Sequence, residues 1–300
     1  MKKIQMGKTR YEVSVLGLGC INFGTTTDEK LSFQLIDRYV ELGGNLLDTS
    51  NNYAVWNGGD GRDSERVIGK WIKMNPSSRA DIFLCTKLGA REEENGGNFQ
   101  AMQGTRRSVI LTEVEKSLET MKTDYIDMLY LHVDDLCTPQ EETMEALAEM
   151  CKKGYVRTIG CSNFRTWRIE SARKICEKNG YPFFSAVQQR YSYFQPVIDN
   201  DFGVQIAAGK ELESYLNYYK DMTFVSHTSL LYGAYFKDDI DDKQYDTAMN
   251  RERLQRIKES GQNPVDYVLR HITNQFGGSI ALVTSKSVKH LEQNIMKIGD

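Results

Sequence analysis

The sequence has no long hydrophobic run, little net charge and few histidines. No stretch approaches the roughly eighteen apolar residues of a membrane-spanning helix, and no apolar segment follows the lysines at its start. Neither membrane insertion nor secretion is therefore expected. The 41 acidic and 38 basic residues leave a net charge of −3, so a nucleic-acid partner is not expected either.

Cysteine patterns of the kinds that bind metal or form redox pairs are also missing. The six cysteines contain no CxxC pair and stand in no zinc-like spacing with the four histidines. Several lie in apolar runs such as IFLCTK and RTIGCSN, where cysteine acts as a small buried hydrophobe. Reduced thiols, a cytoplasmic location and no metal site are expected.

Short β-rich runs alternate with helical segments along all 300 residues, which have ordinary proportions of hydrophobic (40%) and charged (26%) side chains. This alternation predicts parallel strands joined by right-handed crossovers. Eight strand-and-helix units fit one (β/α)8 barrel in a single domain over residues 1–300, and a doubly wound open sheet is the competing architecture. The predicted strands are Val13–Gly19, Asn45–Thr49, Ile82–Lys87, Asp127–His132, Arg157–Ser162, Ser185–Tyr191, Thr223–Leu230 and Ile280–Ser285. Predicted helices include Leu31–Leu42, Ser64–Met74, Thr112–Met121, Glu141–Lys153, Thr166–Asn179 and Asn263–Gln275.

Local signals mark one helix with particular clarity. Thr138 precedes a proline and an acidic first turn, which predicts a threonine N-cap. Gly154 follows the predicted end of the same helix, where a left-handed residue is expected. Two long polar loops, Ala54–Arg62 and Gly89–Arg107, follow strands and so belong to the C-terminal face of the barrel.

Polar residues end three consecutive apolar strands, at the face where barrel active sites lie. Asp48, Lys87 and His132 close the runs NLLD, IFLCTK and MLYLH, and Tyr53 follows Asp48 by five residues. A lysine ammonium beside Tyr53 would lower the tyrosine pKa from about 10, and Asp48 would hold that lysine charged. His132 could donate a hydrogen bond to a carbonyl oxygen. These four residues suit a reaction in which the oxygen of a carbonyl group is protonated while its carbon receives electrons. Alternatively, Asp48 and Lys87 could form a purely structural ion pair.

Motifs over nearly the whole chain resemble the aldo-keto reductase family, whose members are NAD(P)H-dependent (β/α)8 barrels. They are LGLGCINFG at 16–24, ELGGNLLDTSNNY at 41–53, SERVIGKWI at 64–72, EKSLETMKTDYIDMLYLH at 115–132, ALAEMCKKGYVRTIGCSNF at 146–164 and VQQRYS at 187–192. The resemblance implies a catalytic set of Asp48, Tyr53, Lys87 and His132. The glycines of GLGCINFG do not match GxGxxG, because Asn22 stands at the third glycine, so a Rossmann site is not expected.

The resemblance also implies where a nicotinamide cofactor, NADPH or alternatively NADH, would bind. Ser162, Asn163 and Gln188 are expected to hold the nicotinamide amide, since their side chains include both donors and acceptors. The pyrophosphate would lie along the loop near Leu230 and Gly233. The adenosine end would meet the segment 284–294, and the implied contacts there are Lys286, Gln293 and Asn294. Lys286 could attract a 2′-phosphate as a point charge.

Three features depart from the family pattern. His227 stands where the family commonly has an aromatic ring that stacks on the nicotinamide. The motif of the last strand reads LVTSK at 282–286 rather than the usual Ile-Pro-Gly, which leaves the choice between NADPH and NADH open. The chain ends at Asp300, where the family normally continues, so the barrel domain is expected to end early: either the sequence is shortened or the substrate pocket is unusually open.

The implied function is reduction of an aldehyde or ketone to an alcohol, with Tyr53 as proton donor. Two alternatives remain: a nicotinamide-binding sensor barrel with little catalysis, and a metal-dependent hydrolase with ligands in His132-Val133-Asp134-Asp135. The partner is expected to be a small carbonyl compound such as a sugar or a small aldehyde, and the resemblance implies a monomer. Candidate substrate contacts are the polar-loop residues Trp56, Asn57, Asp60 and Arg62 and the aromatic residues Tyr191, Tyr193, Phe194 and Tyr232.

Overall fold

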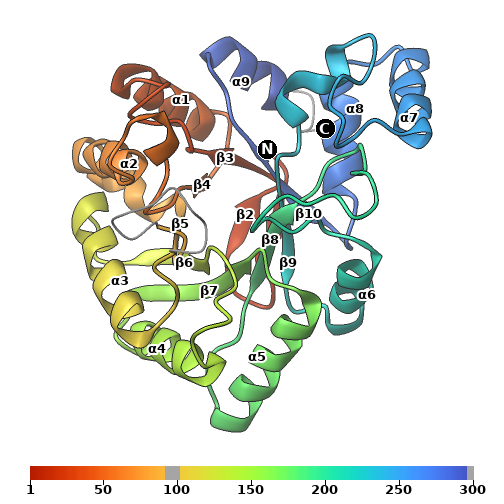
Figure 1. Ribbon diagram of the computed structural model, residues 1–300. Coiled ribbons are helices and arrows are strands. Elements are labelled where there is room, and N and C mark those ends of the chain that lie inside the picture. Colours follow the sequence, from red (N-terminus) through yellow and green to blue (C-terminus); the bar gives the residue numbers. More distant parts are fainter. Residues whose placement is uncertain (92–101, 296–300) are drawn as a thin grey trace.

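The computed structural model describes residues 1–91 and 102–295, and within them eight parallel strands form a closed barrel (Figure 1). The strands are β3 Leu16–Gly19, β4 Leu46–Asp48, β5 Phe83–Leu88, β6 Ile126–Leu131, β7 Val156–Ser162, β8 Ala186–Arg190, β9 Thr223–His227 and β10 Ser279–Val283. They follow one another in chain order around the barrel. Because β10 pairs with both β3 and β9, the predicted (β/α)8 barrel is confirmed and the open sheet is wrong.

Helices surround the barrel and cover the outer face of its strands (Figure 1). They are α1 Glu29–Glu41, α2 Asp63–Met74, α3 Arg107–Met121, α4 Gln140–Lys152, α5 Thr166–Asn179, α6 Lys210–Tyr219, α7 Ala248–Glu259, α8 Pro264–Thr273 and α9 Val288–Ile295. In α1 the buried residues Ser32, Leu35, Ile36 and Tyr39 recur at helical spacing, which turns one stripe toward the barrel. Helices α6, α7 and α9 were not predicted. The polar sequence of α7 has weak apolar periodicity, whereas α6 and α9 have apolar faces that were not identified from the sequence.

The two ends of α4 show one capping prediction that is wrong and one that is confirmed. Thr138 does not cap the helix, because its hydroxyl donates to Asp135 Oδ2 at 2.6 Å and the helix begins after Pro139 without a side-chain cap. A nearby carboxylate is a stronger acceptor and draws the threonine away. Gly154 follows the helix with a φ of +77°, as predicted for a left-handed C-terminal residue.

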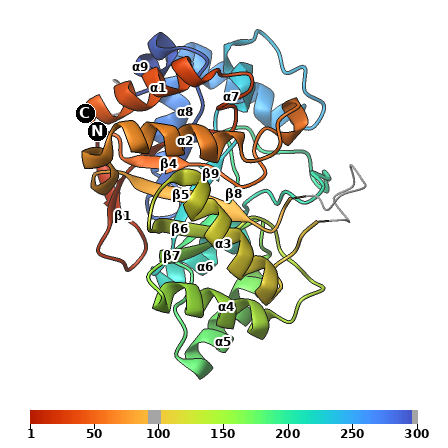
Figure 2. The same ribbon diagram turned by 90° about the vertical axis from the view of Figure 1, so that its left-hand side faces the viewer.

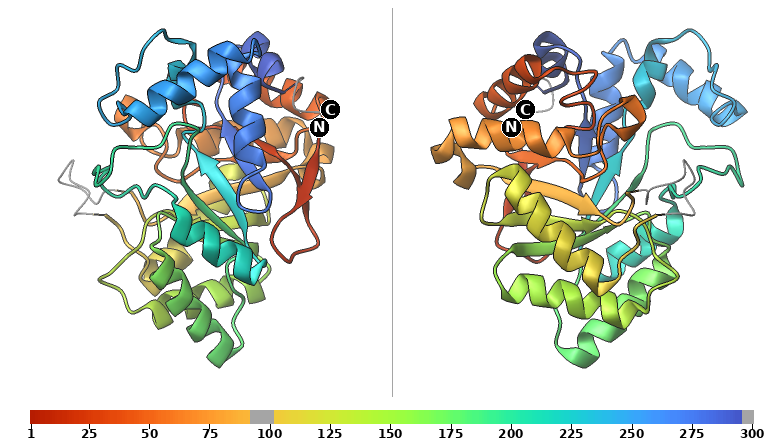
Figure 3. Two further views of the ribbon diagram at one scale, coloured as in Figure 1. Left: turned by 90° about the vertical axis from the view of Figure 1, so that its right-hand side faces the viewer. Right: turned by 60° about the vertical axis from the view of Figure 1, so that its left-hand side comes forward.

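An N-terminal hairpin closes the end of the barrel where the strands begin. Its strands are β1 Lys3–Gln5 and β2 Glu12–Ser14, and the backbone N–H of Gly7 bonds to the Thr223 hydroxyl at the start of β9. Figures 2 and 3 show the hairpin at one end of the barrel and the loops after β8 and β9 extending from the other. Buried Met6 and Val13 join the side chains that fill the barrel interior. The predicted strand 13–19 is therefore two strands, because its partner changes from β1 to the barrel near Val15.

Other strand ends differ from prediction by a few residues. β9 ends at His227 rather than Leu230, because Thr228 has a left-handed φ of +62° and the Ser226 and Ser229 hydroxyls bond in a turn. His132 lies just beyond β6, and Lys87 is the penultimate residue of β5. Residues 92–101 of the second predicted polar loop and 296–300 of the chain end lie outside the described residues. Among the described helices, none is both long and apolar enough to cross a membrane.

Candidate functional site

Three polar side chains meet at the C-terminal mouth of the barrel. The Lys87 ammonium donates to Asp48 Oδ1 at 2.5 Å, to the Tyr53 hydroxyl at 2.7 Å and to the Thr49 carbonyl at 2.9 Å. The Tyr53 hydroxyl donates in turn to Asp48 Oδ1 at 3.3 Å. The side chains of Lys87 and Asp48 are 0% and 2% exposed, so water does not screen their ion pair.

Neighbouring strands and one short loop bring these groups together. Asp48 ends β4, and the adjacent β5 supplies Lys87 from its C-terminal end. The backbone N–H groups of Thr49 and Asn51 donate to carbonyls of β5, at 2.9 and 3.1 Å. These bonds hold the loop after β4 against β5, and the loop thereby places Tyr53 at the barrel mouth beside Lys87.

The electrostatic setting of Tyr53 differs from the sequence expectation. Burial, and then the charge of Asp48 and the hydrogen bond to it, raise the pKa of Tyr53 well above its ordinary value. The expectation that Lys87 lowers this pKa is therefore wrong, because desolvation and the carboxylate outweigh the ammonium. At neutral pH Tyr53 keeps its proton and remains a potential donor.

His132 lies beside this group, with its ring edge-on to Tyr53 at a centroid distance of 5.9 Å. Its Nδ1 is 3.1 Å from the Ser50 hydroxyl oxygen. Burial, together with the Lys87 charge and then His227, holds the pKa of His132 well below its usual range. The imidazole is therefore neutral at physiological pH. The contact with Ser50 was not predicted, although Ser50 stands only two residues after Asp48.

The residues expected to bind the nicotinamide amide lie at the ends of β7 and β8, where Ser162 and Gln188 are register partners. Asn163 Nδ2 donates to the His132 carbonyl at 3.0 Å and to Ser162 Oγ at 3.1 Å, while its Oδ1 accepts from Ile206 N at 3.2 Å. Gln188 Nε2 donates to Asp48 Oδ2 at 2.9 Å. This last bond, which the sequence did not reveal, joins the two predicted sets of site residues.

The residues expected near the pyrophosphate belong to the end of β9 and the turn after it. His227 Nδ1 is 3.0 Å from the Thr228 hydroxyl oxygen, and burial, with the Arg190 and Lys87 charges, lowers the His227 pKa to about 3. The N–H of Gly233 donates to the Leu230 carbonyl at 2.9 Å. Gly233 has a φ of +88°, so this tight turn favours glycine.

The residues expected near adenosine follow β10. Lys286 and Gln293 are exposed, whereas Asn294 is 9% exposed on the buried side of α9. Ser287 begins that helix, because its hydroxyl accepts from His290 N at 3.2 Å. Asn294 is thus turned away from the surface that Lys286 and Gln293 share with solvent.

The polar loop after β4 only partly faces the site. Trp56 is 57% exposed, and its ring meets Tyr53 edge-on at 6.2 Å, while Asn57 is also exposed. Asp60 instead pairs with Arg66 at 2.6 Å. Arg62 forms ion pairs with buried acids, so the charges of Asp60 and Arg62 are both paired, and their contact with substrate stays a prediction.

Arg62 is the centre of a buried polar network behind the site. It pairs with Glu65 at 2.7 Å and also with Glu113. Glu113 accepts from Asn51 Nδ2 at 2.7 Å, and Glu65 accepts from the Thr86 hydroxyl at 2.7 Å. The network ties the loop after β4 and the end of β5 to helices α2 and α3. It was not predicted, because its members are far apart in the sequence.

Of the aromatic residues suggested as substrate walls, most serve the core. Tyr193 and Phe194 are 5% and 0% exposed, and Tyr191 packs edge-on against Phe224 and Phe276. Tyr232 is 95% exposed in the short helix η4, Leu231–Phe236. Tyr232 is therefore the most exposed ring of this set, and Tyr191 is partly exposed.

The side chains of the metal alternative have separate partners. Asp134 pairs with Arg168 at 2.9 Å, and Asp135 accepts from the Thr105, Cys137 and Thr138 backbone N–H groups. His132 bonds to Ser50, as described. Within residues 1–91 and 102–295, no three His, Cys, Asp or Glu side chains are grouped to hold a metal ion.

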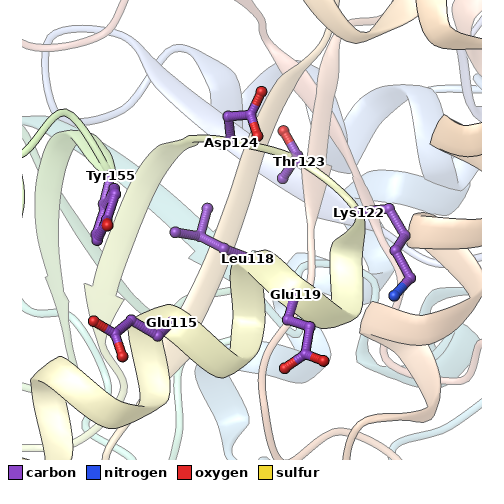
Figure 4. A pocket seen from close by; sticks show the side chains of 7 residues that line it. All are labelled: Glu115, Leu118, Glu119, Lys122, Thr123, Asp124 and Tyr155. Carbon is purple, nitrogen blue, oxygen red and sulfur yellow. The ribbon is translucent and has the colours of Figure 1, made fainter.

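A surface depression of about 490 Å³ lies away from the site (Figure 4). Its lining residues are Glu115, Leu118, Glu119, Lys122, Thr123, Asp124 and Tyr155. Lys122–Asp124 lie in the turn between α3 and β6, and Tyr155 directly precedes β7, so the depression is at the end where strands begin. It is therefore at the opposite end from Asp48, Lys87 and Tyr53.

Comparisons with known proteins agree with this architecture. A model described as "Aldo/keto reductase family" matches residues 15–298. The chain is 32% identical to the uncharacterized oxidoreductase YrpG of Bacillus subtilis, over 65% of this chain and 59% of that protein. It is 32% identical to norsolorinic acid reductase stcV of Emericella nidulans, over 60% of this chain and 47% of that protein. The match thus spans less than two thirds of the length of these two relatives.

Two other comparisons cover more of the chain. The aldo-keto reductase YhdN of Bacillus subtilis is 29% identical over 97% of this chain and 87% of that protein. The solved holo form of the aldo-keto reductase AKR11C1 from Bacillus halodurans has a TM-score of 0.78 and 24% identity, and the match covers 100% of this chain and 91% of that one. The structural likeness shows a shared fold.

Proposed function

The chain belongs to the aldo/keto reductase family, a family of oxidoreductases that use nicotinamide cofactors, and from this premise we propose that it reduces an aldehyde or ketone to an alcohol with NADPH. Tyr53 is the proposed proton donor. The observation that carries the proposal is the buried bonding of Lys87 to both Asp48 and the Tyr53 hydroxyl at the barrel mouth. A simple ion pair between strands would not need the tyrosine.

The residues around the mouth fit a nicotinamide cofactor. Ser162 Oγ accepts from Asn163, and within residues 1–91 and 102–295 the Ser162 hydroxyl donates to no partner. Gln188 offers an amide beside it, and donor and acceptor atoms together suit a carboxamide. Lys286 is exposed and has no carboxylate partner among the described residues, as a phosphate contact requires. The bound cofactor would supply a hydride, which carries two electrons to the carbonyl carbon.

The residues of this chain supply the proton and stabilise the charge that remains after its transfer. In a carbonyl reduction at this site, the carbonyl oxygen would take the phenolic proton of Tyr53 as negative charge develops on that oxygen. The Lys87 ammonium, 2.7 Å from that hydroxyl, stabilises the phenolate left behind. Asp48 holds Lys87 in place, and its second oxygen accepts from Gln188. The raised pKa of Tyr53 keeps the proton available before reaction.

Tyr53→Phe tests this assignment. The phenyl ring keeps the packing against Trp56 and His132, while the proton is lost. We expect turnover to fall by roughly 10²- to 10⁴-fold, with cofactor affinity unchanged. NADPH oxidation across a panel of aldehydes and ketones, together with a fluorescence titration with NADPH, measures both. Tyr218→Phe, at a side chain 78% exposed on α6, is the matched control. Retained turnover in Tyr53→Phe removes that residue from its proposed role.

A sensor barrel that binds the cofactor without much chemistry is the second candidate. The observation that favours it is His227 at the end of β9, which stands where the family commonly has a larger aromatic ring to stack on the nicotinamide. Tight NADPH binding by the unaltered chain, with no oxidation over the whole carbonyl panel, would select this candidate over the reductase.

A further inference from the structure

One carboxylate oxygen holds both ends of the segment that contains Tyr53. Glu113 Oε2, on α3, accepts from Asn51 Nδ2 at 2.7 Å and also from Arg62 Nη2. Asn51 stands just before Tyr53, and Arg62 ends the loop just before α2. The side chains of Glu113 and Arg62 are 3% and 13% exposed, so water has little access to these bonds. We call this arrangement the Glu113 clamp.

The backbone connects the Glu113 clamp to Lys87 and Tyr53. Asn51 donates its backbone N–H to the Lys87 carbonyl at 3.1 Å. Arg62 pairs with Tyr53 in an isolated parallel β-bridge. A movement of either clamped residue is therefore transmitted to the Lys87 ammonium or to the Tyr53 hydroxyl, which lie 2.7 Å apart.

The Glu113 carboxylate is suited to accept two hydrogen bonds on one oxygen. Burial opposes its ionisation, but the Arg62 charge and the Asn51 bond outweigh burial and lower the pKa of Glu113. The group is thus ionised at neutral pH, and hydrogen bonds to an ionised acceptor are stronger than neutral ones. Its other oxygen is 3.3 Å from Lys116 Nζ, and that lysine is 56% exposed. Oε1 therefore faces a surface lysine, whereas Oε2 faces the loop.

The orientation of Asn51 is fixed, and it leaves one polar atom unpaired. Within residues 1–91 and 102–295, Asn51 Oδ1 is buried and has no hydrogen-bond partner. Turning the amide over would set that oxygen against Glu113 Oε2, so the NH2 end must face the carboxylate. An unpaired buried oxygen destabilises the folded state. Departures of this kind from good packing are expected where a residue serves function rather than stability.

We propose that Glu113 is a positioning residue for Tyr53: it holds Asn51 and Arg62 on one oxygen and so keeps the phenolic hydroxyl against Lys87 Nζ. The inference rests on the proposed reductase function and adds to it a residue that touches no reacting atom. An error of about 1 Å in the placement of a reacting group lowers a rate by up to about 100-fold. Loss of the Glu113 clamp therefore acts mainly on kcat.

Glu113→Leu and Glu113→Gln separate the acceptor from the bulk of the side chain. Leucine has no acceptor, so both bonds to the loop are lost. Glutamine keeps one carbonyl oxygen for both bonds, and its NH2 end faces Lys116, whose exposed side chain can turn toward solvent. A separate bond between the Thr49 and Ser64 hydroxyls, at 2.7 Å, is present in both variants and supports folding of the loop.

Steady-state kinetics with a substrate from the carbonyl panel, at saturating NADPH, measures the effect on turnover. We expect kcat to fall about 10- to 100-fold in Glu113→Leu and less than about threefold in Glu113→Gln. NADPH affinity in a fluorescence titration stays unchanged, because Ser162 and Gln188 keep their bonds. The solvent isotope effect on kcat rises in Glu113→Leu, since proton transfer from a misplaced Tyr53 becomes slow. A smaller folded fraction lowers kcat without changing that isotope effect.

Glu149→Leu is the matched control. Glu149 is a glutamate of another outer helix, α4, and it also holds two cations, Arg107 and Lys153. Both partners lie outside the loop after β4. We therefore expect kcat, the solvent isotope effect and NADPH affinity to be the same in Glu149→Leu as in the unaltered chain.

The position of Tyr53 is also measured without cofactor, by ¹⁹F NMR of the chain labelled with 3-fluorotyrosine. The signal lost in Tyr53→Phe assigns the resonance. We expect it to shift or broaden in Glu113→Leu and to return to its original place in Glu113→Gln. If Glu113→Leu does not fold, Asn51→Ala tests the same clamp, because it removes one of the two bonds together with the unpaired oxygen. There we expect a shifted signal and a fall in kcat of about 3- to 10-fold, the size of one hydrogen bond.

The outcomes separate the positioning role from the function on which it rests. An unmoved Tyr53 signal, or an unchanged kcat in an active chain, overturns the inference when found in folded Glu113→Leu or Asn51→Ala. Equal loss of kcat in Glu113→Gln and Glu113→Leu also overturns it, because the acceptor oxygen is then not the cause. A Tyr53 signal that moves in Glu113→Leu and returns in Glu113→Gln, in a chain that reduces no carbonyl, refutes the reductase function while the positioning role stands.

Discussion

Removing one partner of the Asp48–Lys87 pair exposes the other as a bare charge inside the barrel. In Lys87→Met the Asp48 carboxylate keeps only Gln188 Nε2 at 2.9 Å and the Tyr53 hydroxyl at 3.3 Å. In Asp48→Asn the Lys87 ammonium keeps two neutral acceptors, the Thr49 carbonyl at 2.9 Å and the Tyr53 oxygen at 2.7 Å. Both charges are almost wholly buried, so neither can be rescued by water.

The expected loss of stability follows from this uncompensated buried charge. Breaking a buried pair by removing one partner costs about 3–5 kcal/mol of the free energy of unfolding. Lys87→Met belongs at the upper end, because one of the two bonds left to the Asp48 carboxylate is long, at 3.3 Å, and Asp48→Asn belongs at the lower end. The double variant has no buried net charge, so we expect it to cost less than Lys87→Met alone. The two changes are then non-additive by more than about 3 kcal/mol, the cost of Asp48→Asn alone.

Urea unfolding followed by circular dichroism measures these differences from the midpoint and slope of each transition. Lys237→Met is the control, since it makes the same substitution in a pair with Asp241 whose side chains are 49% and 67% exposed. That change should cost no more than about 1 kcal/mol. Additive single effects, or a Lys87→Met cost as small as the control, would refute the argument from burial.

Two further predictions concern pH and cofactor choice. The folded pKa of His227 is about 3 and its unfolded value about 6.5, so the native state is favoured above pH 6.5 and loses about 1.4 kcal/mol per unit as the pH falls toward 3. His227→Asn should make the pH dependence of unfolding shallower by that amount between pH 6 and 4.5, and an unchanged slope contradicts the prediction. Lys286→Met should weaken NADPH binding about tenfold and leave NADH binding unchanged, in fluorescence titrations of both. Equal loss for both cofactors would mean that Lys286 does not meet the 2′-phosphate.

Much of the barrel follows from patterns that are local in the sequence. Apolar runs that end at Asp48 and Lys87 mark strands, and residues such as Leu35 and Ile36 at helical spacing mark α1, because strands and helices bury side chains with different periods. Polar residues at strand ends predicted that Asp48, Lys87 and His132 share one face. In a closed parallel barrel this placement is unavoidable, and the structure brings them together with Tyr53.

Contacts between distant segments were decided by the tertiary structure. The sequence could not show that Val13 belongs to a hairpin while Leu16 belongs to the barrel, because both have the same β-rich character and differ only in their partner. The bond from Gln188 to Asp48 joins residues 140 positions apart.

The protonation states of the site residues also depend on how deeply each side chain is buried, which the sequence does not specify. Tyr53 beside a lysine reads as a tyrosine with a lowered pKa, yet burial and the Asp48 charge raise that pKa. Arg62 reads as a loop residue above the substrate, yet it pairs with Glu65 and Glu113 behind the site. Sequence patterns determine on which face of the barrel a residue lies. Packing determines what it touches and how far it is from water, and so sets its ionisation.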